Sequence, residues 1–124
     1  CEKRAKIGTM VRHHLPKSMS LLGGESLDHT HWLAPILCDD PNDLIAFLYA
    51  HHFDATKGCS SLIPVLAPEG GTQPKQAIAA FDKLVYLPVF PPAGLRGAQR
   101  LTELLLDYVA QRKDRPTKTR KAAK

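Results

Sequence analysis

Residues 84–113, LVYLPVFPPAGLRGAQRLTELLLDYVAQRK, decide the fold of this chain. A short β-type run passes through a proline corner directly into one long amphipathic helix. In that helix the apolar residues recur at three- and four-residue spacing, so they line one face that must pack against another layer. These residues are Ala98, Leu101, Leu104, Leu105, Tyr108 and Val109. We predict that the layer beneath them is a sheet.

Upstream of this segment, helix and strand patterns alternate. Residues 3–15 read as a short helix that Pro16 ends. Residues 30–38, THWLAPILC, read as a first strand. A helix follows directly, because Asp40 can cap it and Asp43 places a negative charge near the positive end of the helix dipole.

The middle of the chain continues the pattern. Residues 60–68, SSLIPVLAP, are a second strand candidate, and residues 75–83 form a helix whose apolar side chains we expect to face inward. These side chains are Ala77, Ile78 and Phe81, with Leu84 after them. The third strand, VYLPVF, leads into the final helix. The order α-β-α-β-α-β-α predicts an α/β (α+β) two-layer sandwich with helices on one face of a small, mostly antiparallel sheet.

Prolines complicate this sheet. Pro35, Pro64 and Pro88 put one proline inside each strand candidate, although a three-stranded sheet has only two edges. At least one of them must therefore lie at a strand end or bulge, or turn its nitrogen away from the ladder.

The 124 residues form one domain by size. From residue 112 onward the chain has seven basic residues and one acidic residue, whereas the rest has 10 basic and 11 acidic residues. The net charge of +5 therefore belongs to a tail. We expect a folded domain over residues 1–111 and a basic, disordered tail over 112–124. Nucleic-acid binding through this tail ranks last, because the body lacks an aromatic stacking platform.

Cysteine content and hydropathy bear on the compartment. Three cysteines at irregular spacing do not favour a disulfide framework, so a reducing, cytoplasmic setting is expected. No apolar run approaches the roughly 18 residues of a membrane span, which predicts a soluble protein with no membrane partner. The chain starts at Cys1, without Met and within a helical pattern, which suggests a fragment of a longer protein.

No catalytic or metal-binding constellation stands out. The histidines His13, His14, His29, His31, His51 and His52 could with Cys38 and Cys59 supply zinc ligands. Their spacing matches no zinc motif. Adjacent histidines on a helix also point about 100° apart, so one metal site rarely uses both. Helix capping explains Asp39, Asp40 and Asp43, and Cys59 has no assignable base. We therefore predict no catalytic residue and no metal site in this chain.

Two stretches carry a resemblance to a known family. They are HWLAPILCDDPNDLIAFLYAHHFDATKGCSSL at 31–62 and PKQAIAAFDKLVYLPVFPPAGLRGAQRLTELLLDYV at 74–109. In this order they resemble the C-terminal small domain of a fold-type I, pyridoxal-phosphate-dependent aminotransferase, closest to the DegT/StrS-type sugar aminotransferases. The chain departs from that pattern at ATKGCSSL, where the family tends to carry a histidine-tyrosine-proline element, so it would be a divergent branch.

The resemblance implies a domain that closes over the active site of an amino-group transferase acting on a keto or keto-sugar substrate. The cofactor would sit in the large domain of the same polypeptide, the complete enzyme would be a homodimer, and this chain alone would be inactive. The residues expected to face the substrate cleft are His31, Trp32, Lys57, Ser60, Ser61 and Arg96. The alternative is a standalone ligand-binding or regulatory module of ferredoxin-like shape.

Overall fold

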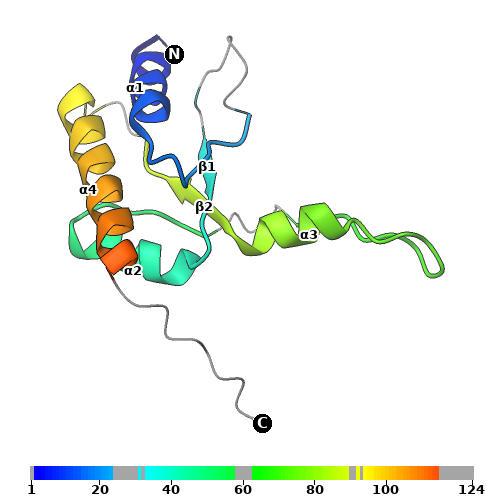
Figure 1. The fold of residues 1–124 in the computed structure, drawn as a ribbon. Helices are drawn as coiled ribbons and strands as arrows, with labels where there is room; N and C mark the ends of the chain where they lie inside the picture. Colours follow the sequence, from blue (N-terminus) through cyan, green and yellow to red (C-terminus); the bar gives the residue numbers. More distant parts are fainter. Residues whose placement is uncertain are drawn as a thin grey trace.

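The computed structural model describes residues 2–23, 31, 33–57, 63–89, 92 and 94–114. Over these residues the chain forms four helices and a two-stranded antiparallel sheet (Figure 1). In chain order they are α1 (Glu2–His14), β1 (Ala34–Leu37), α2 (Pro41–Ala50), α3 (Lys75–Asp82), β2 (Leu84–Leu87) and α4 (Gly94–Asp114). The predicted α+β class is confirmed, but the order of elements is not.

The sheet positions one apolar face against the helices. Ala34 pairs with Leu87 and Ile36 with Val85, and all four are buried in the main core. This core also takes residues from the three helices that cover the sheet: Ile7 and Val11 of α1, Leu44 and Leu48 of α2, and Ala98, Leu101, Leu104, Leu105 and Tyr108 of α4. Burying the α4 stripe is the packing that its three- and four-residue spacing predicted.

Antiparallel register explains how β1 tolerates a proline. Pro35 lies opposite Tyr86, whose N–H and carbonyl both bond to Thr56 on the far side of β2, with N···O distances of 2.7 and 3.2 Å. The Pro35–Tyr86 pair is therefore a non-hydrogen-bonded pair, in which no N–H is needed. The carbonyl of Pro35 accepts from the Leu22 N–H at 2.9 Å on the opposite side. Its nitrogen thus faces away from the β1–β2 ladder, and Pro88 follows the end of β2.

The predicted second strand is wrong over its described part. Residues 63–68 form no strand, and residues 60–62 lie outside the described residues. Pro64 and Pro68 supply no N–H to a ladder. The free edge of β2 pairs instead at a single position with Thr56, just as the outer edge of β1 pairs with Leu21. The observed order is α-β-α-α-β-α.

The inward-facing side of α3 is also a wrong prediction. The helix forms almost over the expected residues but contains no buried residue. Ala77 is exposed, and Ile78 and Phe81 are only half-buried. Figure 1 shows why: α3 points away from the sheet and the other helices. Leu84 is buried, but as the first residue of β2.

The helix ends agree better with the sequence predictions than the second strand and α3 do, because they depend on neighbouring residues. The side chain of Asp40 accepts a hydrogen bond from the Asp43 N–H at 3.2 Å, so the predicted cap of α2 is confirmed. Helix α1 ends at His14, two residues before Pro16. At the other end of the chain, α4 continues to Asp114, three residues into the segment expected to be a tail.

Candidate functional site

The residues expected to face a substrate cleft do not line a common pocket. His31 is 1% exposed and lies against Gly8 of α1. Lys57 is exposed beside the sheet edge, and Arg96 is exposed in the first turn of α4. None of these three lines the pockets described below, and Trp32, Ser60 and Ser61 lie outside the described residues.

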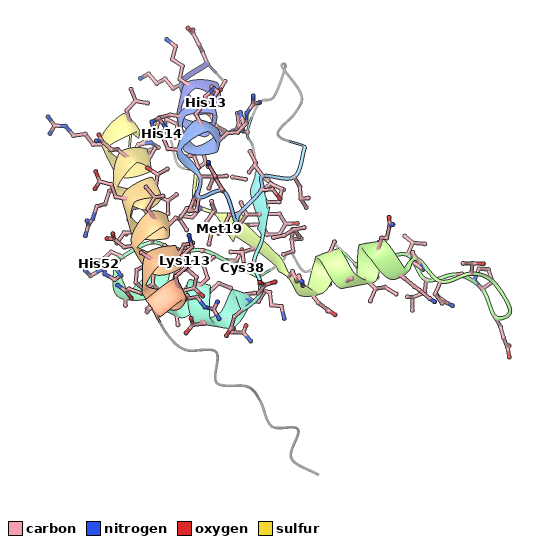
Figure 2. The ribbon with its side chains drawn as sticks, in the orientation of Figure 1. His13, His14, Met19, Cys38, His52 and Lys113 are labelled. Atoms are coloured by element: carbon pink, nitrogen blue, oxygen red, sulfur yellow. The ribbon has the colours of Figure 1, made fainter. Side chains whose placement is uncertain are left out.

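A different set of residues forms a pocket where the last turns of α4 meet the end of β1. Its volume is about 310 Å³, near the lower limit for small-molecule sites. Figure 2 labels three residues that line it, Met19, Cys38 and Lys113. The full lining is Ser18, Met19, Leu37, Cys38, Asp39, Tyr108, Val109, Arg112 and Lys113. We call it the α4 pocket.

A polar network joins the wall of this pocket to the start of α2. Tyr108 Oη donates to Asp43 Oδ2 at 2.9 Å and accepts from Arg112 Nη1 at 2.7 Å. Arg112 Nη2 also lies 3.7 Å from Asp40 Oδ2. The Asp40 carboxylate that caps α2 and the Asp43 carboxylate in the first turn of α2 thus also contact the last turns of α4. Because charge-assisted bonds to a carboxylate are stronger than neutral ones, the network fixes these two helices relative to each other.

The protonation states in the pocket argue against covalent chemistry. Burial raises the pKa of the Cys38 thiol, although a backbone hydrogen bond from Asp40 opposes the shift. Burial and the hydrogen bond to Asp43 raise the pKa of Tyr108 well above its ordinary value. Both groups therefore stay protonated at neutral pH, and a protonated thiol is a poor nucleophile. The pocket offers hydrogen bonds and a guanidinium, which can bind a ligand with an anionic group.

Metal binding and membrane spanning find no support in the described part of the chain. No three histidine, cysteine, aspartate or glutamate side chains there gather closely enough to hold an ion. Among the same residues, no helix combines the length and apolar character that crossing a bilayer requires.

Sequence reasoning missed the network for a specific reason. It assigned Tyr108 to the core, Arg112 to a tail, and Asp40 and Asp43 to capping alone. The four-residue spacing of Tyr108 and Arg112 on one helix was a visible signal of contact. Their pairing with Asp43 was not visible, since it joins positions 65 residues apart.

Comparison of the chain with protein-family models, with curated proteins and with solved structures finds no match.

Proposed function

We propose that this chain is a non-catalytic covering domain, the C-terminal small domain of a pyridoxal-phosphate-dependent, DegT/StrS-like aminotransferase that acts on a keto or keto-sugar substrate. It leans against the large domain of the same polypeptide, closes over the active site and helps select the substrate. In this proposal the complete enzyme is a cytoplasmic homodimer.

The observation that carries the proposal is the second face of the sheet. Pro35, Leu37, Leu84 and Tyr86 alternate with the core residues along β1 and β2, and none of them belongs to the main core. Leu84 and Tyr86 are buried and the other two are half-buried. An antiparallel sheet with a solvated outer face alternates apolar with polar residues. This sheet is apolar on both faces, and Pro35 and Leu37 are only half-buried on the second one, as expected of a layer that a further body covers.

The described residues do not fit the cofactor itself. Pyridoxal phosphate requires a lysine that forms a Schiff base, and such lysines are activated by desolvation. Every lysine that the structure describes is exposed. The domain therefore contributes no step of the transfer in this proposal, and its role is to bind, orient and exclude water.

The test uses the complete polypeptide that contains this chain. Substituting Leu37→Asp on the second face should lower kcat/KM by at least about tenfold while cofactor absorbance is retained, because a buried charge separates the two layers. Leu33→Asp is the matched control, since Leu33 is 44% exposed just before β1 and should change little. Equal activity of both variants and the wild type, or a complete polypeptide without a Schiff-base lysine, refutes the proposal.

The α4 pocket favours the second candidate, a standalone ligand-binding or regulatory module. Its guanidinium and hydroxyl groups, above an apolar floor, suit a small ligand with an anionic group. For this candidate Arg112→Ala should abolish the thermal stabilisation of the isolated chain by a panel of small carboxylates, whereas Leu33→Asp, which lies outside the pocket lining, should leave it intact.

A further inference from the structure

A second pocket lies between α2 and α4, next to the α4 pocket, and we name it the α2–α4 pocket. Figure 1 shows the last turns of α4 beside α2, where this pocket lies. Its volume is about 220 Å³. The lining residues are Asp43, Ala46, Phe47, Tyr108, Gln111 and Arg112. Because Tyr108 and Arg112 also line the α4 pocket, these two side chains form a wall that the two pockets share.

The α2–α4 pocket is the more aromatic of the two. The centroids of the Phe47 and Tyr108 rings lie 5.3 Å apart, and the rings are tilted by 53°. The guanidinium of Arg112 lies 5.3 Å from the centroid of the Tyr108 ring. A planar ring in this pocket therefore meets aromatic rings and a flat cation, and both attract a ring beyond what burial alone provides. The lining of the α4 pocket contains no aromatic residue besides Tyr108.

The α4 pocket is the more cationic of the two. Its charged lining residues are Arg112, Lys113 and Asp39. The Asp39 carboxylate is already paired with Lys83, which lies outside the lining, at 3.2 Å between Nζ and Oδ1. Among the described residues Lys113 forms no ion pair. The charge that the α4 pocket offers to a ligand is therefore positive.

These differences determine the orientation of a ligand that spans the shared wall. Of the two pockets, Asp43 lines only the α2–α4 pocket, where its carboxylate repels an anionic group and offers an acceptor to a ring N–H. Lys113 lines only the α4 pocket. Arg112 lies between them, and its contact with Asp40 is long, at 3.7 Å from Nη2 to Oδ2. A ring in the α2–α4 pocket therefore places its anionic substituent at Arg112 and Lys113.

We propose that the α4 pocket and the α2–α4 pocket together bind one small aromatic carboxylate. Its ring lies against Phe47 and Tyr108, and its carboxylate lies between Arg112 and Lys113. The Arg112 side chain is 38% exposed, so it can bend around the ligand without opening a gap in the core. The inference deepens the second candidate function and rests on it, and it is independent of the aminotransferase proposal.

Isothermal titration calorimetry of the chain with three probes tests the class of ligand. Indole-3-acetate has a ring with an N–H and a carboxylate. Indole-3-acetamide keeps the ring without the charge, and acetate keeps the charge without the ring. We expect indole-3-acetate to bind at least about tenfold more tightly than either of the other two, because it alone occupies both pockets. Acetate or the amide binding as tightly as indole-3-acetate overturns the proposal.

Two substitutions assign the two halves of the site. Phe47→Leu removes the ring contact but keeps an apolar side chain, so it should weaken binding of indole-3-acetate about threefold or more and leave acetate unaffected. Lys113→Gln removes one exposed charge and should weaken indole-3-acetate about threefold without affecting indole-3-acetamide. Phe81→Leu and Lys57→Gln are the matched controls, since both residues lie outside the two linings, and they should bind like the wild type.

The outcomes distinguish this inference from the functions proposed above. Indole-3-acetate that binds Phe47→Leu as tightly as the wild type overturns the shared site, but the second candidate still stands if Arg112→Ala abolishes stabilisation by small carboxylates. No binding of indole-3-acetate to the wild type overturns the inference as well. If Phe47→Leu does not fold by circular dichroism, Lys113→Gln and the three probes decide. Activity of the complete polypeptide bears on the aminotransferase proposal alone.

Discussion

Substituting Gly8→Ala in α1 should destabilise the protein, although alanine is the better helix former. A Cβ atom built on Gly8 would overlap the Cβ and Cγ atoms of His31. His31 is buried at 1% exposure and already has a positive φ of 51°, so it has little freedom to withdraw. The bare backbone of Gly8 is what allows this imidazole to pack against the helix.

The magnitude follows from two opposing effects. Glycine to alanine in a helix interior stabilises by about 1 kcal/mol. Forcing an extra carbon into a filled core destabilises by about 1–3 kcal/mol, and overlap with a whole ring places this site near the upper end. The net loss in the free energy of unfolding should be about 2 kcal/mol.

Denaturant unfolding of four chains measures this effect: the wild type, Gly8→Ala, His31→Gly and the double variant. In the His31→Gly background the alanine should no longer destabilise, because its steric partner is gone and only the helix propensity remains. Thr9→Ala, at the neighbouring exposed position, controls for propensity and should stabilise slightly. A Gly8→Ala chain more stable than the wild type would refute the reasoning.

Three further predictions concern the α4 pocket. Tyr108→Phe should lower the free energy of unfolding by about 1–2 kcal/mol, because it leaves Asp43 without its buried donor. The control is Tyr49→Phe, at a side chain that is 73% exposed, and it should leave the free energy of unfolding unchanged. Equal losses in the two variants would contradict the network. Since folding raises the pKa of Tyr108 above its unfolded value of about 10, its contribution should be complete below about pH 10 and fall as the pH rises further. Unfolding curves across that range should show this decline in the wild type and a smaller one in Tyr108→Phe. Because Cys38 is buried and its pKa is raised, iodoacetamide should alkylate it far more slowly in the folded than in the unfolded chain. Peptide mass mapping can follow the reaction at this residue. Equal rates in the two states would exclude a protected thiol.

Sequence reasoning reached the α+β class from the helix and strand patterns along the chain, and the buried stripe of α4 from the spacing of apolar residues along that helix. It reached the cap of α2 because Asp40, Pro41 and Asp43 act on their own neighbours. The stripe and the cap depend on residues three or four positions apart, so the sequence displays them directly.

It did not predict which residue pairs with the free edge of β2, or that residues 63–68 and α3 lie outside the core. An apolar run such as residues 63–68 resembles a strand whether or not a ladder is available to it. Thr56 occupies the edge of β2 at the position of Tyr86, and residues 63–68 remain outside the sheet. The apolar side of α3 likewise fits a buried helix, and only its direction in space leaves it uncovered.

The candidate site shows the same division. Helical geometry places residues four apart side by side, so the sequence alone determines that Tyr108 and Arg112 share one side of α4. That both reach the carboxylates of α2 was decided by tertiary structure alone. Local periodicity determines which face of a helix is apolar, but the element that this face meets depends on how the whole chain closes around its core.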